Sequence, residues 1–191
     1  MFCVSFEFEL KGSLFDEKGV NDVVFVLQGY YAVTCLPASW NNTVRVVAGI
    51  TGVASTSSTA FNGAQDLSFD SNNTLYVADY NNNRIQRFVS GSATGVTVPG
   101  LSISLAGSVY VRNNGAIYVG DVNNCRILRV LNGNVTVVAG GRGCSSGLDQ
   151  MSTSLGLYID SNYNIYVSDY GNHRVAMWTA TNPNISQVVF I

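Results

Sequence analysis

A segment that occurs three times in this chain constrains its fold more than any other feature. The copies are LSFDSNNTLYVADYNNNRIQRF (residues 67–88), VYVRNNGAIYVGDVNNCRILRV (residues 109–130) and LYIDSNYNIYVSDYGNHRVAMW (residues 157–178). Tyr76, Tyr118 and Tyr166 occupy one position of the repeat and lie 42 and 48 residues apart. A repeat of about 40 to 50 residues is typical of β-propeller blades.

Each copy has the pattern of short strands rather than of helices. In the first copy, residues 67–69 precede a polar turn, residues 74–78 lead to an asparagine-rich loop, and residues 84–88 follow that loop. Asn and Asp tolerate the left-handed backbone that such turns require. Four antiparallel strands make one blade. We expect the fourth strands at residues 95–98, 136–139 and 187–191.

The composition agrees with an all-β fold. Hydrophobic residues make up 47% of the chain and charged residues 12%, which places it far from disordered sequences. It has 19 glycines and ten tyrosines but only three prolines, which favours strands and tight turns over long helices.

The shared residues resemble the NHL-repeat family, in which a YVAD-type strand, an asparagine-rich loop and an Arg-hydrophobic strand recur. The resemblance covers about residues 40–191 and implies a β-propeller, commonly of six blades, with the first strand of each blade nearest the axis. We therefore expect an all-β arc of three four-stranded antiparallel blades, about residues 64–99, 104–140 and 154–191. One extra strand is expected at residues 44–48, and the arc would be half of a six-bladed propeller.

An arc of three blades leaves blade faces and strand edges open. We expect the remaining blades to come from a missing part of the chain or from a second copy. Residues 1–39 carry no repeat signature and form either a degenerate blade or an unrelated N-terminal segment.

The polar cluster after the second strand of each copy is predicted to hold the blade together. An Asp at the end of one strand can accept backbone N–H bonds and can pair with the Arg that begins the next strand. A catalytic site occurs once, whereas this cluster occurs in every copy. The predicted structural positions are Tyr76, Asp79, Arg84, Tyr118, Asp121, Arg126, Tyr166, Asp169 and Arg174.

The loop between that Asp and Arg is the predicted recognition surface, because the shared positions belong to the blade. Its residues are Tyr80, Asn81, Asn82 and Asn83 in the first copy, Val122, Asn123 and Asn124 in the second, and Tyr170, Gly171, Asn172 and His173 in the third.

Two cysteines and four sequons suggest an oxidising compartment. Cys125 stands where a third strand begins and Cys144 just beyond the fourth, so antiparallel pairing would bring them to one edge and allow a disulfide. We expect an extracellular or secreted protein, although MFCVSFEFEL at the N-terminus is not a signal peptide; a cytoplasmic protein with reduced cysteines is the alternative. The candidate N-glycosylation sites are Asn41, Asn72, Asn134 and Asn184.

The repeats contain no catalytic set that occurs only once. His173 is the only histidine, which argues against a zinc site. The longest run of apolar residues, 23–27, is far too short to span a bilayer. We therefore predict no catalytic residue, no cofactor and no membrane span.

The predicted function is a non-enzymatic NHL propeller module that binds a protein or another macromolecule. One alternative is an RNA-binding NHL propeller of the tripartite-motif type. Nucleic acid is disfavoured, because residues 40–191 hold eight Arg and seven Asp and therefore no broad basic surface. The other alternative is a fragment of a metal-dependent propeller enzyme, either a peptide lyase or a lactonase-like hydrolase.

Overall fold

The computed structural model describes residues 45–188. All of these residues except Arg45 belong to the second of the two units into which the chain divides, Val46–Ile191. Residues 1–39, predicted as a degenerate blade or an unrelated segment, lie outside the described residues.

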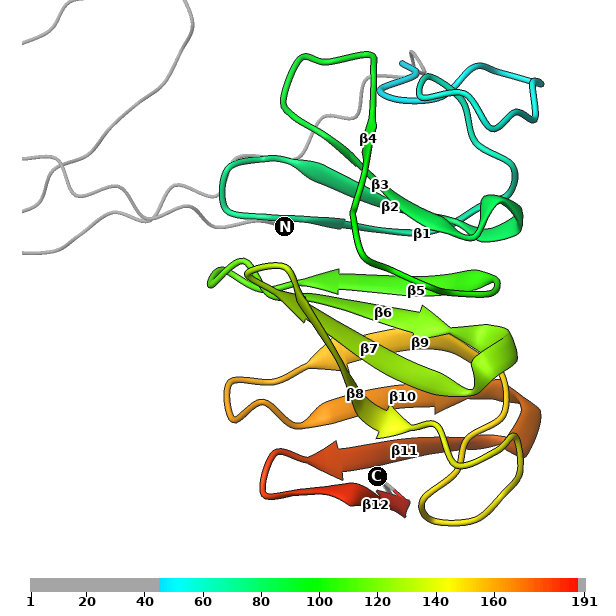
Figure 1. The fold of residues 1–191 in the computed structure, drawn as a ribbon, viewed down its shortest axis with the longest axis vertical. Helices are drawn as coiled ribbons and strands as arrows, with labels where there is room; N and C mark the ends of the chain where they lie inside the picture. The colour runs from blue at the N-terminus through cyan, green and yellow to red at the C-terminus, as the bar shows by residue number, and fades with distance from the viewer. Residues whose placement is uncertain (1–44, 189–191) are drawn as a thin grey trace, which may run out of the picture. The chain divides into compact units, whose positions relative to one another are not determined.

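The second unit consists of three four-stranded antiparallel sheets whose strands lie side by side in chain order (Figure 1). The first sheet contains β1 (Ala64–Phe69), β2 (Leu75–Asp79), β3 (Arg84–Phe88) and β4 (Val96–Thr97). The second contains β5 (Ala106–Val111), β6 (Ile117–Asp121), β7 (Arg126–Leu131) and β8 (Asn134–Gly140). The third contains β9 (Ser154–Ile159), β10 (Ile165–Asp169), β11 (Arg174–Thr179) and β12 (Asn182–Val188). The expected all-β architecture of three blades is confirmed.

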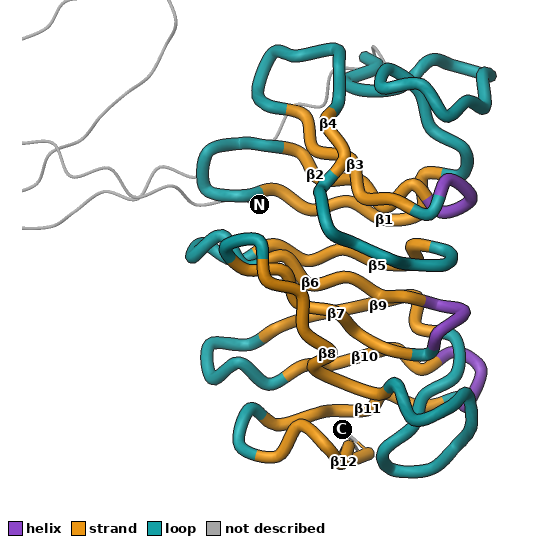
Figure 2. The backbone as a smooth tube through the Cα atoms, in the orientation of Figure 1, coloured by secondary structure: helices purple, strands orange, loops and turns teal. Residues whose placement is uncertain are grey.

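A short 3-10 turn joins the second and third strands of every blade, and all three turns lie at the same end of the strands (Figure 2). Because neighbouring strands are antiparallel, the tight turns between the first and second strands lie at the opposite end. We call the end with the 3-10 turns the hairpin side, and the end with the tight turns between the first and second strands the turn side. The 3-10 turns are η1 (Tyr80–Asn82), η2 (Val122–Asn124) and η3 (Tyr170–Asn172).

The blades are held together mainly by apolar faces that pack on each other. One core cluster joins Tyr76 and Ile85 of the first blade to the second blade, and another joins Tyr118 and Ile127 of the second blade to Trp178 and its neighbours in the third. Burying apolar side chains contributes about 1.5 to 3 kcal/mol each. All residues of β2 and β6 are buried, because these strands have neighbours on both faces.

Two hydrogen bonds fix the first blade against the second along their first strands. The Val109 N–H donates to Asp66 Oδ2 at 2.9 Å, and the Val111 N–H donates to Ser68 Oγ at 3.0 Å. Asp66 and Ser68 therefore face the next blade, and the alternation of β1 turns the side chains between them away from it.

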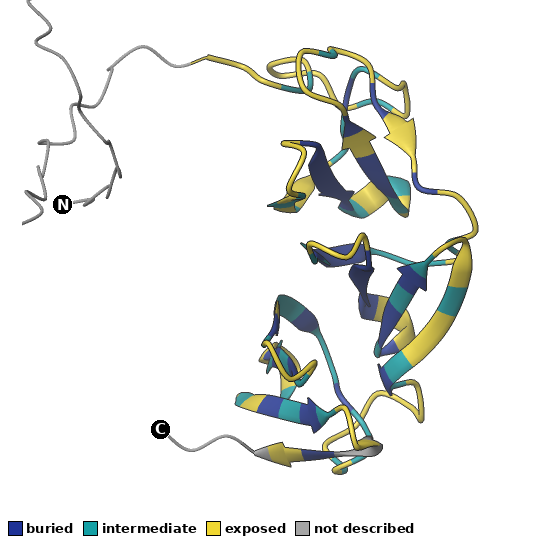
Figure 3. Cartoon of the chain, turned by 90° about the vertical axis from the view of Figure 1, so that its left-hand side faces the viewer, coloured by how far each residue is buried: buried dark blue, intermediate teal, exposed yellow. Residues whose placement is uncertain are grey.

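The strands of the first and third blades carry exposed residues (Figure 3), and several of these residues are apolar. Leu67 is 59% exposed, whereas its counterpart Val109 in the second blade is 2% exposed. Val175 is 41% exposed at a position where Ile127 is fully buried. The same repeat position is therefore buried where two described blades pack on each other and exposed where no described blade covers it.

Two predicted strands differ from the structure. Residues 45–48 pair with no described strand, and Val46 and Val47 are exposed, so the predicted extra strand is wrong within the described residues. Its VVAG sequence repeats that of the end of β8, but a strand also needs a partner for its backbone groups. The last strand, predicted at residues 187–191, begins earlier at Asn182, because the chain reverses directly after β11.

Candidate functional site

A buried carboxylate at the hairpin side organises the first blade. Asp79 is fully buried and ends β2. Its Oδ1 accepts the Asn62 N–H at 2.7 Å, and its Oδ2 accepts bonds from Asn82 Nδ2 at 2.8 Å and Arg84 Nε at 2.7 Å. One side chain thus joins the segment before β1, the 3-10 turn and the start of β3.

The other two blades repeat this arrangement with the same atoms. Asp121 and Asp169 are also fully buried, and both pair with the Nε of the Arg that follows, Arg126 at 2.7 Å and Arg174 at 2.8 Å. Hydrogen bonds between a carboxylate and an arginine are shorter and stronger than those between neutral groups. The remaining donors are Ser104 N–H and Asn124 in the second blade, and Ser152 N–H and Asn172 in the third.

The arginines also bind the loops that lead into their blades. Arg84 donates to the carbonyl groups of Thr56, Ser57 and Ala60, and Arg174 does the same to residues 146, 147 and 150. Arg126 reaches only the Ser102 carbonyl. Each Asp–Arg pair therefore closes a hairpin and fastens a loop, which is a structural task repeated in every blade.

The predicted recognition loops are partly occupied by this scaffold. Asn82, Asn124 and Asn172 donate to the buried Asp of their blades, and Asn82 and Asn172 also donate to the carbonyls of Ser55 and Ser145. These three asparagines therefore hold the loop in place, and their role in recognition stays a prediction. They occupy the same repeat position, and a shared contact explains why all three copies have Asn there.

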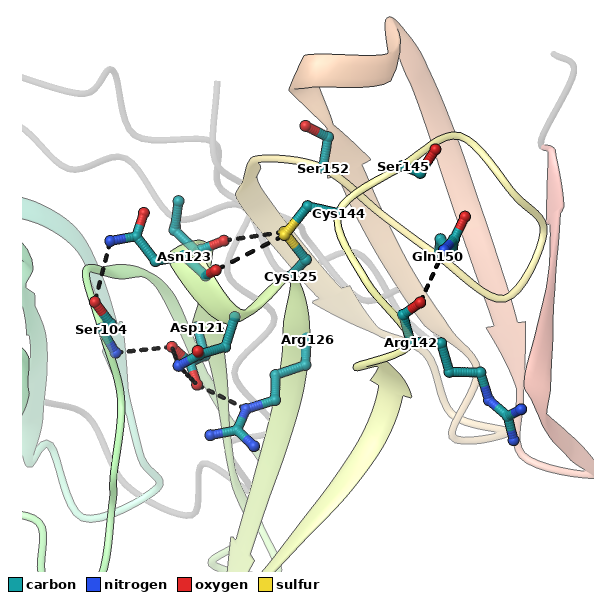
Figure 4. The surroundings of a disulfide bond; sticks show 12 residues. Ser104, Asp121, Asn123, Cys125, Arg126, Arg142, Cys144, Ser145, Gln150 and Ser152 are labelled. Atoms are coloured by element: carbon teal, nitrogen blue, oxygen red, sulfur yellow. Dashed lines mark hydrogen bonds and ion pairs between the residues drawn. A yellow bond between two sulfur atoms is a disulfide. The ribbon is translucent and has the colours of Figure 1, made fainter.

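The residue after the 3-10 turn has a left-handed backbone in every blade, with φ of 53° at Asn83, 49° at Cys125 and 55° at His173. In the first two blades it also fastens the loop to the next blade. Asn83 Oδ1 accepts the Leu105 N–H at 2.7 Å, and Cys125 forms a disulfide with Cys144, with the two Cα atoms 5.3 Å apart (Figure 4). The predicted disulfide is confirmed, and Asn83 is a structural link.

The remaining residues of the recognition loops differ in exposure. Val122 is buried, and Asn123 donates through Nδ2 to Ser104 Oγ at 3.0 Å. Asn81 donates through Nδ2 to Asn62 Oδ1 at 3.3 Å, and Tyr80 is half-buried. Asn81 and Asn83 in the first loop and Asn123 and Asn124 in the second are exposed, and the third loop has three exposed residues. There Tyr170 is 66% exposed, and Gly171 and His173 are also exposed.

Two of the four sequons can be placed. Asn72 and Asn134 are exposed, at the turn before β2 and at the start of β8, and remain candidate glycosylation sites. Asn41 and the side chain of Asn184 lie outside the described residues.

A polar groove of about 340 Å³ lies on the turn side, between the second and third blades. The T-shaped pair of Tyr110 and Tyr158, with ring centroids 5.6 Å apart, lies in its wall. Tyr158 is 55% exposed and Tyr163 46% exposed, so aromatic rings are open to solvent here. The lining residues are Tyr110, Val111, Arg112, Asn113, Asn114, Tyr158, Ile159, Asp160, Ser161 and Tyr163.

Arg112 spans this groove from the β5–β6 turn to the β9–β10 turn. Its Nη1 donates to the Asp160 carbonyl, and its guanidinium carbon lies 4.1 Å from the centroid of the Tyr163 ring. Such cation–π stacking fixes the guanidinium plane. Its Nε and Nη2 have no hydrogen-bond partner among the described residues.

Arg112 departs from the repeat, because the other two blades have an Asp at its position. Asp70 accepts the N–H groups of Asn72 and Thr74, and Asp160 accepts those of Asn162 and Asn164. Desolvation raises the pKa of both carboxyls, but these hydrogen bonds outweigh it and hold each pKa below the ordinary value of 3.8.

The residue at the turn, Asp or Arg, affects the pKa of the tyrosine that follows it in each blade. Burial raises the pKa of Tyr118, whereas the nearby cations Arg129 and Arg112 oppose that rise. In the first blade burial and Asp70 both raise the pKa of Tyr76, and Arg87 opposes them. Burial and Asp160 raise the pKa of Tyr166, where Met177 takes the place of the arginine. The tyrosine hydroxyls also donate to their carboxylates, Tyr76 to Asp70 at 3.4 Å and Tyr166 to Asp160 at 3.3 Å.

Sequence reasoning missed this groove because its residues come from the turns of two blades. The signal was present in the repeat, where Arg112 interrupts a position that is otherwise Asp. Within residues 45–188 no three or more His, Cys, Asp or Glu side chains gather as a metal site would require. Over the same residues, no helix is long and apolar enough to cross a membrane.

Comparisons with known proteins agree with the architecture. The NHL repeat family model matches residues 61–88, and no curated protein sequence matches the chain. An auxiliary nutrient binding protein from Bacteroides thetaiotaomicron superposes with a TM-score of 0.54 at 16% identity, over 68% of this chain and 36% of its own. A protein of unknown function from the same organism gives 0.51 at 15%, over 64% and 34%. A streptogramin B lyase gives 0.50 at 14%, over 68% and 41%.

These likenesses concern the fold alone, because the identities are low. The chain spans about two fifths or less of the length of these three structures.

Proposed function

The chain belongs to the NHL-repeat β-propellers, and from that premise we propose that it is a non-enzymatic module that binds a protein or another macromolecule. The observation that carries this proposal is a difference between the two ends of the blades. At the hairpin side, the polar side chains that recur in all three repeats form hydrogen bonds within the protein. The turn side opens a polar groove lined by exposed tyrosines and an arginine.

The chemistry of this groove supports binding rather than catalysis. Tyrosine rings provide large rigid contact area at low entropic cost, which is why they are enriched at protein interfaces. The arginine is already oriented by its stacking on Tyr163, so binding orders few further side chains.

Site-specific photo-crosslinking tests this proposal with a matched pair of positions. A photoreactive phenylalanine analogue replaces Tyr163 on the turn side or Tyr170 on the hairpin side, both of which are exposed tyrosines. We expect a partner adduct from position 163 that Tyr158→Ala weakens, and little from position 170. Adducts formed only from position 170 would instead place recognition in the hairpin loops predicted from the sequence.

We further propose that the protein works in an extracellular or other oxidising compartment. The disulfide between Cys125 and Cys144 supports this proposal, since cytosolic thiols are normally kept reduced. The exposed sequons at Asn72 and Asn134 are compatible with it. A mass spectrum of the protein from its native source, taken without reductant, would show the disulfide and the glycan mass; free thiols would contradict the proposal.

A further inference from the structure

We propose that the turn-side groove binds the carboxylate of an acidic peptide segment, with Arg112 as its principal donor. This inference rests on the proposed binding function and assigns its ligand chemistry. It starts from the only turn among the three repeats in which the Asp is replaced by a cation.

The exchange of Asp for Arg leaves an uncompensated positive charge. In the first blade Asp70 and Arg87 flank Tyr76, so the charges balance. In the second blade both flanking groups, Arg112 and Arg129, are cations around Tyr118. None of the ion pairs among the described residues includes either of these arginines.

Arg129 reinforces this positive charge from within the blade. Its Nε is buried and has no hydrogen-bond partner. Arg129 pairs with Tyr118, which in turn pairs with the groove residue Tyr110, so its charge adds to the positive potential at the groove without contacting the ligand.

The geometry of Arg112 matches a carboxylate. Its Nη1 is held by the Asp160 carbonyl and its plane by Tyr163, which leaves the Nε and Nη2 edge free. That edge presents two parallel N–H groups, which is the arrangement that carboxylates bind in a bidentate manner. The neighbouring Asn113 and Asn114 are exposed and line the same groove.

The charge balance favours a carboxylate over a phosphate. Hydrogen bonds keep the pKa of Asp160 low despite desolvation, so its carboxylate is ionised beside the groove. Two arginines and one aspartate leave one net positive charge, which a single carboxylate neutralises and a dianionic phosphate would exceed. The exposed rings of Tyr158 and Tyr163 provide contact for an apolar residue next to the acid.

The test is a titration of the 191-residue chain with two dipeptides, monitored by NMR at the arginine Nε–H resonances. N-acetyl-Asp-Phe-amide carries the carboxylate, and N-acetyl-Asn-Phe-amide is its neutral counterpart. We expect saturable shifts at Arg112 with the Asp peptide, and binding weaker by about tenfold with the Asn peptide, as expected for loss of a hydrogen bond between charged groups. Equal affinity for the two peptides would overturn the assignment.

The variant Arg112→Asp restores the residue found in the other two turns, so the turn should fold as they do. We expect it to abolish binding of the Asp peptide, and Arg112→Gln to weaken it by about tenfold. The matched charge reversal Arg142→Asp, at a side chain that is 60% exposed and outside the groove, should leave binding unchanged. Binding that survives in Arg112→Asp, or that is lost equally in Arg142→Asp, would contradict the proposal.

Inorganic phosphate and a short single-stranded RNA serve as competing probes. Tighter binding of either than of the Asp peptide would replace the carboxylate assignment. Crosslinking from position 163 separates this inference from the proposed function. If the wild type forms the crosslinked adduct but binds the Asp and Asn peptides equally, only the carboxylate assignment fails; if the wild type binds the Asp peptide but forms no adduct, only the partner proposal fails.

Discussion

At the scale of single residues, the three Asp–Arg pairs offer a natural comparison, because the arginines share one role and differ in their contacts. Arg84 is 15% exposed and Arg126 is 28% exposed, and both pair with a fully buried carboxylate. Arg84 also binds three loop carbonyls, whereas Arg126 binds one.

We expect Arg84→Met to lower the free energy of unfolding by about 3 to 5 kcal/mol, because it leaves Asp79 buried without its ion partner and frees the carbonyls. Arg126→Met should cost less by about 1 to 3 kcal/mol, since it loses two fewer hydrogen bonds to loop carbonyls and each contributes about 0.5 to 1.5 kcal/mol. Urea denaturation of both variants beside the wild type measures the difference. Equal losses would show that the loop carbonyls add nothing to stability.

The repeat also explains which of these residues could be predicted from the sequence. Asp79 and Arg84 were identifiable because the same packing problem is solved in each blade by the same residues. Asn82 was not assigned to the scaffold, although the three copies, aligned on their Asp and Arg, all have Asn at its position. The groove at Arg112 depends on a contact with the next blade, and no local pattern encodes that contact.

At the scale of elements, the loop between β8 and β9 is fastened by the disulfide between Cys125 and Cys144, whereas the equivalent loop before β1 has no disulfide. Cys144 pairs in an isolated bridge with Met151, and Ala54 pairs in the same way with Phe61 before the first blade. The backbone of this loop therefore forms with an alanine at that position. The strands themselves were predictable from the alternation within each copy, whereas β12 was placed too late because its turn carries no Gly or Asp signal.

The variant Cys144→Ala should fold and should lower the free energy of unfolding by about 3 kcal/mol, the value for a closed loop of this size. Thermal unfolding with and without dithiothreitol checks this expectation. The reductant should destabilise the wild type to the level of the variant and leave the variant unchanged. A wild type that is insensitive to the reductant would show that the link contributes little.

At the scale of the whole molecule, the two outer blade faces are the unfinished part of the architecture. Leu67 and Phe69 on the first blade are 59% and 55% exposed, and Val175 on the third is 41% exposed. Between blades, the equivalent positions of Leu67 and Val175 form core. In a purified sample, a second copy of the chain can cover these faces, with the third blade of one copy packed on the first blade of the other.

We expect the 191-residue chain to self-associate with concentration through this head-to-tail contact, which uses a different face on each copy. Leu67→Glu blocks the first face and Val175→Glu the third, so each variant alone should be monomeric in size-exclusion chromatography with light scattering. Mixed together they should form a dimer, because each retains the face that the other lacks. Self-association of the wild type without dimer formation in the mixture would rule out blade-on-blade packing as its cause.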